Sequence, residues 1–333
     1  MTHLRVVYKR GEEVRKKLIA AGVFDRSRKV IREGDFLLLP LKEEIDLPGT
    51  EIVYVEGRGV KRKAASLADS LKDALNAGEL ALLPRSFDII GDIAVLEIPS
   101  ELLDKERIIG ESLLSTFKNI KVVARKETSV GTEYRTREVV VIAGENRTET
   151  VHKEYGCLYK LDVTTAYFSP RLGTERMRVA SQVKEGERVL VMFAGVGPYA
   201  ILIAKKTKPR EVYAIELNPF AVKYLKENIK INKVDVKPIL GDVKTETPKL
   251  GKFDRIIMPL PKDAGDFLDV AIPALNKGGV IHFYTFAHTP KEAADDVRKT
   301  SERLGHEIEV LASVECGTYS PRLSRMCVDF RLS

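Results

Sequence analysis

The chain has no tryptophan, one glutamine and three cysteines among its 333 residues. The cysteines Cys157, Cys316 and Cys327 are too few and too scattered for a disulfide framework or a zinc site. No apolar run approaches the roughly 20 residues that a membrane-spanning helix needs. The first residues, MTHLRVVYKR, contain no apolar core of a secretory signal. We therefore expect a protein of the reducing cytoplasm, with buried thiols and no membrane association.

The charge balance is basic. The 55 Lys and Arg residues exceed the 48 Asp and Glu residues and give a net charge of +7. Such a surface favours polyanions, with nucleic acid as the first candidate, although many basic proteins bind none. Abundant lysine and glutamate with scarce amides also indicate a heat-adapted source.

The length predicts more than one domain, and changes of pattern place the limits at residues 1–78, 79–150 and 151–333. In the first domain we expect a helix at 11–21, strands at 35–41 and 51–55, and a break at 77–79. The basic segment 57–63 (GRGVKRK) is either a phosphate-contacting loop or a solvated one. The second domain reads as a small α+β module with a helix at 100–115 and strands at 87–90, 93–98, 120–125 and 138–142.

The third domain alternates strands and helices, which is typical of a doubly wound α/β sheet. The last two strands have no room for a helix between them and should form a reversed, antiparallel hairpin. A seven-stranded, mostly parallel sheet of this kind is the outline of a class I (Rossmann-like) methyltransferase. The expected strands are 189–193, 211–215, 236–240, 254–258, 280–286, 307–314 and 325–331.

A glycine turn follows the first of these strands. Gly195 and Gly197 lie between the apolar run VLVMF and a helix, and the next strand ends in the carboxylate of Glu216. Glycines allow backbone to approach a ligand closely, and an acid at this place can accept from two ribose hydroxyls. The pattern alone fits S-adenosylmethionine (SAM), NAD or a tight turn without a ligand.

Two further strand ends carry candidate residues. Asp242 follows the third strand and could accept from an adenine amine or simply cap a helix. Pro259 and Pro261 follow the fourth strand and make a stiff loop with few amide donors. That loop is either a substrate-holding element or a rigid strand exit.

Polar and aromatic residues gather before the glycine turn, at 167–176 (YFSPRLGTER) and 134–138 (YRTRE). An aromatic ring beside serine, proline and arginine can offer a stacking surface and phosphate contacts. Taken alone, Tyr167 could equally be a core residue, and Glu175 and Arg176 a solvated helix face.

Four segments together resemble the archaeal and eukaryal tRNA (guanine-N1)-methyltransferase family: 151–156, 161–163, 167–176 and 192–198. The resemblance covers roughly residues 80–333, and the first domain is similar to the tRNA-binding N-terminal domain of that family. It implies SAM as methyl donor without a metal, methylation of the guanosine at tRNA position 37, and a monomer.

By position, Glu175 resembles the family's general base, Arg135 the arginine that steadies the guanine oxygen, and Tyr167 the aromatic residue that packs on the target base. A carboxylate can remove the guanine N1 proton, and an arginine can stabilise the charge that develops on the oxygen. The positions that line the cofactor site in the family fall on Arg176, Phe193, Ala194, Gly195, Gly197, Glu216, Leu217, Asp242, Val243 and Pro259.

One departure opens an alternative. The family usually has Asn-x-Pro where this chain has Pro259-Leu260-Pro261. An archaeal branch of the family methylates carbon 7 of a tricyclic wyosine precursor at the same tRNA position, and a less polar loop suits that larger base. A dual-function or dedicated enzyme of this branch is therefore the alternative. A tRNA-binding protein without catalysis is the alternative from another class. A nicotinamide dehydrogenase is disfavoured, because nothing before the glycine turn serves hydride transfer.

Overall fold

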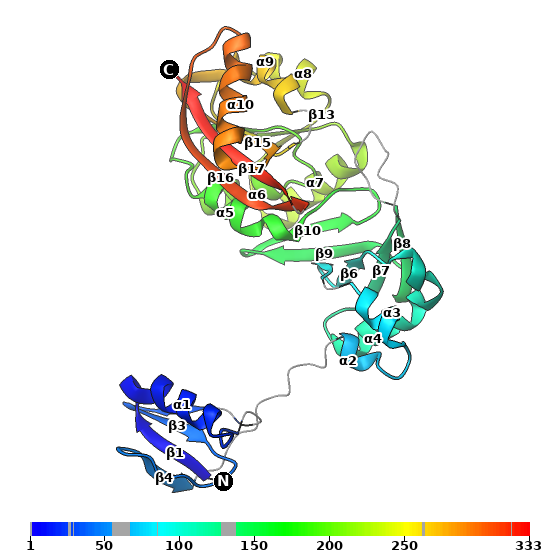
Figure 1. The fold of residues 1–333 in the computed structure, drawn as a ribbon. Coiled ribbons are helices and arrows are strands. Elements are labelled where there is room, and N and C mark those ends of the chain that lie inside the picture. Colours follow the sequence, from blue (N-terminus) through cyan, green and yellow to red (C-terminus); the bar gives the residue numbers. More distant parts are fainter. Residues whose placement is uncertain are drawn as a thin grey trace. The chain divides into compact units, whose positions relative to one another are not determined.

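The computed structural model describes residues 2–25, 28, 30–54, 67–84, 86–127, 138–261, 264–320 and 322–333. The chain divides into two compact units, Met1–Asp73 and Ala74–Ser333, which we describe one at a time (Figure 1). The basic segment 57–63 and the proposed catalytic Arg135 lie outside the described residues. The domain limits expected at residues 78 and 150 stay a prediction.

An antiparallel sheet covered by one helix forms the first unit. Helix α1 (Gly11–Ala20) follows the 3-10 turn η1 (Tyr8–Arg10) and packs Val14 and Leu18 against Leu4 of the sheet. The strands run in the order β2-β3-β1-β4 and comprise β1 (Thr2–Val7), β2 (Ile31–Glu33), β3 (Phe36–Pro40) and β4 (Glu51–Tyr54). The sequence predicts α1, β3 and β4 but not β1 and β2, which show no clean alternation of apolar and polar residues. The short helix α2 (Leu67–Ser70) ends this unit.

The break expected at residues 77–79 is wrong. Helix α3 (Ala77–Leu82) begins there, in spite of Gly78. The Asn76 side chain accepts the N–H of Glu79 at 3.0 Å, and the Glu79 carboxylate accepts the N–H of Asn76 at 2.8 Å. This reciprocal cap satisfies two backbone donors and outweighs the low helix propensity of one glycine.

A four-stranded sheet with a crossover helix follows. Its order is β5-β6-β7-β8, and only β6 and β7 are parallel. The turn η2 (Ser100–Lys105) and helix α4 (Glu106–Thr116) connect these two parallel strands. The strands are β5 (Asp88–Ile90), β6 (Ile93–Leu96), β7 (Val122–Lys126) and β8 (Val139–Gly144), so the predicted α+β module is confirmed.

A hairpin that the sequence does not predict leads into the large sheet. Strands β9 (Glu149–Glu154) and β10 (Cys157–Asp162) pair antiparallel across a two-residue turn. Tyr155 and Gly156 both have positive φ, as the tightest hairpin turn requires. In α7 (Pro219–Asn232), the side chains of Asn228 and Asn232 bond to the backbone of Lys160 and Leu158 and fix β10 on this helix.

The large sheet has seven strands in the order β13-β12-β11-β14-β15-β17-β16. The first five strands in this order pair parallel with one another, and β17 runs antiparallel to both β15 and β16. The strands are β11 (Arg188–Val191), β12 (Glu211–Glu216), β13 (Lys237–Leu240), β14 (Phe253–Met258), β15 (Leu275–Ala287), β16 (Ile308–Ser320) and β17 (Leu323–Leu332). The class I methyltransferase sheet with its reversed terminal hairpin is confirmed.

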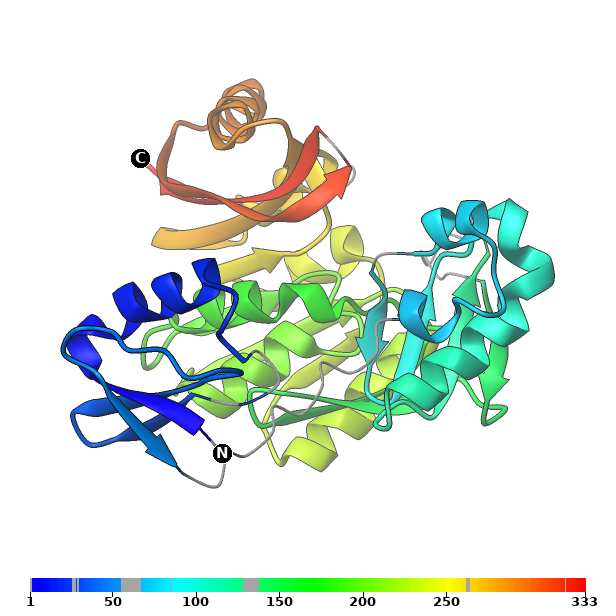
Figure 2. The ribbon, with the colours of Figure 1, turned by 60° about the horizontal axis from the view of Figure 1, so that its bottom comes forward.

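Helices cover both faces of this sheet (Figure 2). Along β11, Val189 and Val191 face one core, which includes residues of α5, α6 and α7, whereas Leu190 faces the other, which includes residues of α9 and α10. Both faces are therefore buried, as the continuous apolar strands predict. The remaining elements are η3 (Pro170–Leu172), α5 (Gly173–Ala180), α6 (Pro198–Lys206), α8 (Val243–Glu246), η4 (Thr247–Leu250), η5 (Ala264–Phe267), α9 (Leu268–Ala271) and α10 (Pro290–Arg303).

The length and polarity of the helices show whether any of them could span a membrane. Within the described ranges, no helix combines the length and the apolar character that crossing a bilayer would take.

Candidate active site

The glycine turn and the acid meet at the edge where the parallel strands end. Glu216 is the last residue of β12, and its Oε2 accepts the backbone N–H of Gly195 at 2.7 Å. Its Oε1 accepts the N–H of Asn218 at 2.8 Å. Gly195 and Gly197 have φ of 56° and 93°, and a Cβ on Gly197 would lie 2.4 Å from Leu225 Cδ1. Only glycine fits this turn without strain or a clash.

The Glu216 carboxylate retains the capacity to bind a ligand. Burial raises its pKa, and hydrogen bonds from the backbone of Asn218, Gly195 and Leu217 oppose that rise. An ionised carboxylate has about four acceptor positions, so one is left beyond these three donors. A ribose hydroxyl fits that position.

The segment that carries Tyr167 lies beside this turn. Asn218 donates from Nδ2 to the carbonyl of Thr165 at 2.7 Å and caps α7 by accepting the N–H of Phe220 at 2.9 Å. A Cβ on Gly195 would lie 3.7 Å from the carbonyl oxygen of Tyr167. The proposed base-stacking residue and the proposed cofactor turn are therefore neighbours.

The other proposed cofactor residues gather around the same strand ends. Asp242 is exposed, and its Oδ1 accepts the N–H of Lys244 at 2.7 Å, so it caps α8. Phe193, with φ of 53°, meets Phe267 edge-on at a centroid distance of 4.8 Å. Ala194 and Val243 are buried in the sheet cores, while Leu217 is 42% exposed.

The proline loop after β14 has no backbone donor to offer within residues 259–261. Pro259 and Pro261 have no N–H, and the N–H of Leu260 donates to the carbonyl of Met258 at 2.8 Å. A ligand next to Pro259 therefore meets carbonyl oxygens and apolar surface.

Glu175 lies in the first turn of α5 and is 7% exposed. Its Oε1 accepts from the hydroxyl of Tyr284 at 2.6 Å and from Nη2 of Arg178 at 2.8 Å. Its Oε2 accepts from Nε of Arg178 at 2.7 Å. Three of about four acceptor positions are thus occupied by described residues, and the remaining one is on Oε2.

A buried chain of polar groups holds Arg178. Its Nη1 donates to Oδ2 of Asp329 at 2.6 Å, and His282 Nδ1 lies 2.6 Å from the other Asp329 oxygen. Nη1 of Arg255 lies 2.7 Å from His282 Nε2, so the imidazole accepts there and donates through Nδ1. Burial lowers the pKa of His282, which keeps the ring neutral. Burial alone would raise the pKa of Asp329, but His282 and Arg178 outweigh it and hold that pKa well below its usual range.

Tyrosine hydroxyls connect Glu175 to the helix that follows the glycine turn. Tyr199 of α6 donates to the hydroxyl of Tyr284 at 2.9 Å. Burial raises the pKa of both phenols, so both stay protonated and can donate. The carboxylate and the glycine turn are therefore parts of one packed structure.

Arg176 is buried next to Glu175 and makes an ion pair on another strand. Its Nε and Nη2 donate to the two oxygens of Glu154 at 2.8 and 2.6 Å, and its guanidinium lies 5.0 Å from the ring centroid of Phe168. The structure shows Arg176 joining α5 to β9, and a role at the cofactor stays a prediction.

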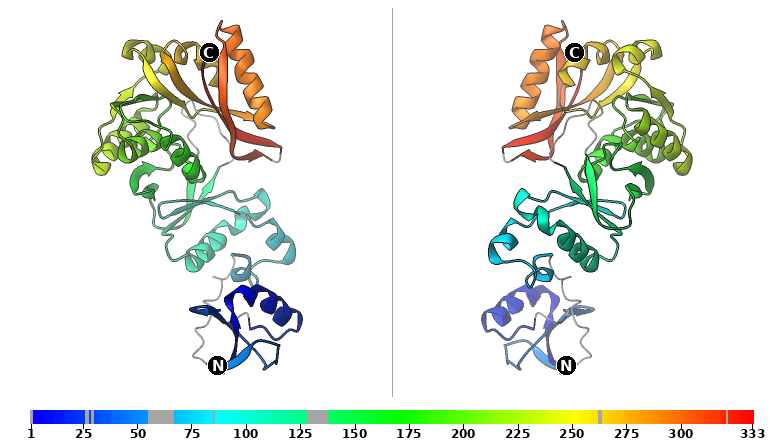
Figure 3. Two further views of the ribbon diagram at one scale, coloured as in Figure 1. Left: turned by 90° about the vertical axis from the view of Figure 1, so that its left-hand side faces the viewer. Right: turned by 90° about the vertical axis from the view of Figure 1, so that its right-hand side faces the viewer.

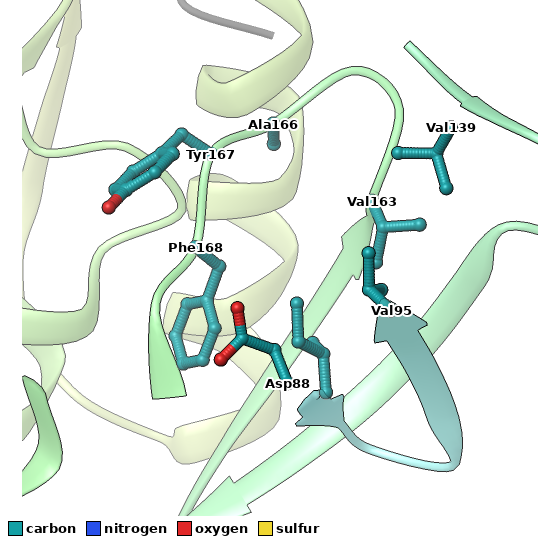
Figure 4. Close-up of a pocket in the computed structure, with 8 residues that line it drawn as sticks. Asp88, Val95, Val139, Val163, Ala166, Tyr167 and Phe168 are labelled. Atoms are coloured by element: carbon teal, nitrogen blue, oxygen red, sulfur yellow. The ribbon is translucent and has the colours of Figure 1, made fainter. Parts of the chain in front are cut away.

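Tyr167 and Phe168 lie on opposite sides of their segment (Figure 4). Phe168 points with Asp88 toward a pocket of about 20 Å³, close to the space that one water molecule needs. Tyr167 also borders this pocket, but its ring points away from it. The residue is 39% exposed, and its hydroxyl accepts from Nη2 of Arg325 at 3.4 Å. Its ring is therefore accessible to a base, whereas the pocket beside Phe168 is too small for one.

Three family models match successive parts of the chain. The TRM5/TYW2 methyltransferase domain matches residues 150–311, the TYW2 N-terminal domain residues 67–148, and the tRNA methyltransferase 5 N-terminal domain residues 4–47. A tRNA (guanine(37)-N(1))-methyltransferase Trm5b of Pyrococcus abyssi is 46% identical over 99% of this chain and 98% of its own length. The chain belongs to the TRM5/TYW2 family of tRNA methyltransferases.

Other members of the TRM5/TYW2 family are similar in structure and in sequence. The solved complex of aTrm5 and tRNALeu has a TM-score of 0.72 and 33% identity and covers both chains completely. A tRNA (guanine(37)-N(1))/4-demethylwyosine(37)-methyltransferase Taw22 of Nanoarchaeum equitans is 33% identical over 72% of this chain and 98% of its own length. The expected family, fold class and tRNA partner are confirmed.

Sequence reasoning missed most of the shell around Glu175 in this TRM5/TYW2 chain. Arg178 had a local signal, because it lies three residues after Glu175 on the same helix face. Tyr284 and Asp329 come from strands more than 100 residues away and leave no such trace. Asn218 had a signal too, since asparagine before Pro219 is a typical helix start.

Proposed function

We propose that this chain transfers a methyl group from SAM to N1 of the guanosine at position 37 of tRNA. The observation that carries the proposal is the single remaining acceptor position of Glu175, in a carboxylate whose other positions are fixed by Arg178 and Tyr284. Because only one acceptor position of this carboxylate is open, it can accept a proton only from a group placed at that position.

The residues at the strand ends fit SAM. The remaining acceptor position of Glu216 takes a ribose hydroxyl, and Gly195 and Gly197 let the backbone approach. Asp242, Leu217 and Phe193 border the same edge. SAM supplies a methyl group on a sulfonium, which needs no metal to activate it.

Glu175 acts as the general base. Guanine N1 carries a proton and is a weak nucleophile, so its lone pair becomes available only when a base removes that proton. The proton passes to Oε2 of Glu175 as the N1–CH₃ bond forms and the S–CH₃ bond breaks. Arg178 fixes the carboxylate through the transfer and leaves that oxygen position open.

Tyr167 and Arg135 act on the target base. Extracting a base from its stack costs a few kcal/mol, and stacking on the exposed Tyr167 ring offsets part of that cost. Arg135 stabilises the charge that builds on the guanine oxygen.

A wyosine precursor is the second candidate substrate. The loop of Pro259, Leu260 and Pro261 leaves no backbone donor for a polar base edge, and the Taw22 relative is named for both substrates. A tricyclic base with fewer polar edges suits this loop.

One incubation separates the candidates. The enzyme receives labelled SAM and three tRNAs, which carry guanosine, adenosine or the wyosine precursor at position 37, and the products are read by nucleoside mass spectrometry. We expect 1-methylguanosine from the first tRNA and nothing from the second. A methylated product from the third tRNA would show that the enzyme also methylates the wyosine precursor. No product from any tRNA, with SAM and tRNA both bound, would instead support a binding protein.

Glu216→Gln should weaken SAM binding by about 10- to 100-fold, because hydrogen bonds to a charged acceptor contribute roughly 1.5–3 kcal/mol. Isothermal titration of the variant measures this directly. Glu211→Gln at the other end of β12 is the matched control and should bind SAM as the wild type does. Equal affinities of Glu216→Gln and wild type would remove Glu216 from the cofactor site.

Deleting residues 1–73 should weaken tRNA binding more than SAM binding. This unit has its own core, and all proposed catalytic and cofactor residues lie in the other unit. Titration with tRNA and with SAM compares the two affinities, and tRNA affinity should fall steeply with salt. Equal losses would give residues 1–73 a purely structural role.

We further propose that the enzyme acts as a monomer in the cytoplasm.

A further inference from the structure

A partly exposed aromatic pair lies at the turn end of the reversed hairpin formed by β16 and β17. Phe286 near the end of β15 and Tyr319 near the end of β16 stack at a centroid distance of 4.3 Å with an interplanar angle of 39°. Tyr319 is 65% exposed. An exposed aromatic ring supported by a second ring and beside positive charge is typical of a surface that binds single-stranded nucleic acid.

Arg325 joins this pair to the active site. It stands directly opposite Phe286 in the pairing of β15 with β17, and its guanidinium carbon lies 5.8 Å from the Phe286 ring centroid. Its Nη2 donates to the hydroxyl of Tyr167 at 3.4 Å. Its Nε is buried and has no hydrogen-bond partner among the described residues.

The pleat of β15 sets the spacing to the general base. Tyr284, which donates to Glu175, and Phe286 are two residues apart and point to the same face of the strand. Two residues along a strand span roughly 7 Å. Strands β15, β17 and β16 are neighbours in the sheet and lie side by side in Figure 3, so Phe286, Tyr319 and Arg325 come from adjacent strands, with Phe286 two residues from the Tyr284 that contacts Glu175.

We propose that Phe286, Tyr319 and Arg325 form a stacking site for a base of the anticodon loop that adjoins the methylated nucleotide. The proposal rests on the proposed function, because the occupant belongs to the same RNA strand as the base on Tyr167. When the target base leaves its stack, its neighbour loses one stacking partner. Tyr319 and Phe286 replace that partner, and Arg325 contacts the strand between the two bases.

Irregular pairing in the hairpin supports this use of Tyr319. The register of β16 with β17 shifts between Glu315 and Gly317 and again between Thr318 and Ser320. Such bulges bend a strand and change the direction of the side chains near them. His288 donates from Nδ1 to the carbonyl of Arg322 at 2.5 Å and ties the hairpin end to β15.

Tyr319→Leu and Tyr319→Trp in the full chain test the proposal. Leucine keeps apolar area but has no aromatic face, whereas tryptophan keeps one. We expect leucine to raise the Kd and KM for a guanosine-37 transcript by about 5- to 150-fold, the range of one base–aromatic stack. Tryptophan should stay near wild type. SAM affinity should change in neither variant. Leu311→Ala, which changes another exposed apolar residue on β16, is the control.

Transcripts with an abasic site at position 36 or 38 identify the occupant. For the position that stacks on Tyr319, wild type and Tyr319→Leu should bind the abasic transcript within about twofold of each other. Tyr319→Leu that binds every transcript like wild type would overturn the proposal. So would a loss of equal size on the intact and both abasic transcripts, or a change of oligomeric state without a loss of tRNA affinity. The proposed function fails on a different result, namely no methylation by the wild type.

Discussion

Glu175→Gln is expected to lower the rate of methyl transfer to guanosine 37 by about 10²- to 10⁴-fold, the usual contribution of a general base. Glutamine has nearly the same shape but cannot take up the N1 proton. The Tyr284 hydroxyl can still donate to its oxygen, so the surroundings of the residue remain. Single-turnover kinetics with saturating SAM and tRNA measure the chemical step.

Two measurements separate a chemical defect from a structural one. The SAM affinity of Glu175→Gln should equal that of the wild type, because Glu175 makes no hydrogen bond to the glycine turn within the described residues. Glu185→Gln, a change in an exposed glutamate in the turn after α5, should leave the rate unchanged. If Glu175→Gln turned over like the wild type, Glu175 would have no part in proton removal.

Arg178→Met is expected to cost about 3 kcal/mol of folding stability and about 10²-fold in rate. Glu175 and Asp329 are 7% and 2% exposed, and both lose the guanidinium that compensates their charge. Removing one partner of a buried ion pair costs roughly 3–5 kcal/mol, and a side chain that is 26% exposed belongs at the lower end. For a unit of this size the melting temperature should fall by roughly 6–12 °C. The rate falls because a carboxylate misplaced by about 1 Å loses its alignment.

The stability difference should shrink in acid. His282 and Arg178 hold the pKa of Asp329 well below its usual range, so the ionised side chain stabilises the fold at neutral pH. That contribution is complete above about pH 4 and is lost as the pH falls below the ordinary aspartate value. Thermal melts of wild type and Arg178→Met between neutral and acid pH should therefore converge.

Matched variants guard this second prediction. Arg178→Lys keeps the charge but loses the planar fork, so its stability should lie between wild type and methionine. Arg298→Met removes an exposed pair with Asp295 on α10 and should change stability by less than about 1 kcal/mol. Arg178→Met with wild-type rate and melting temperature would show that Arg178 neither positions Glu175 nor compensates Asp329.

Much of the catalytic fold was predictable because its signals are local. Apolar strands alternate with helices from residue 188 onward, and the short connection before Leu323 allows only a hairpin. The hairpin of β9 and β10 was missed because Tyr155 takes a positive φ, a conformation uncommon for that residue. Helix α3 was missed because Gly78 was given more weight than the cap formed by Asn76 and Glu79.

Local sequence signals also predicted part of the candidate site, and missed the contacts between distant segments. Gly195, Gly197 and Glu216 follow from strand, turn and strand, and the structure brings them together. The alternative for Asp242, a helix cap, is what the structure shows, and adenine contact stays a prediction. Arg176 lies in an ion pair with Glu154, a strand residue that no spacing rule connects to it.

By itself the sequence determined the order of elements and the ligand edge, because hydrophobic period, glycine and proline act over a few residues. The proposed base, Glu175, was identified only by the resemblance to the family. Only the tertiary structure decided what surrounds that base. His282 and Asp329 meet because β15 and β17 pair antiparallel, and Arg178 reaches Asp329 from α5. Burial there makes an unpartnered charge too costly to keep. Pairing register depends on two segments that are distant in the sequence, and the sequence of one segment does not show which residues of the other it will pair with.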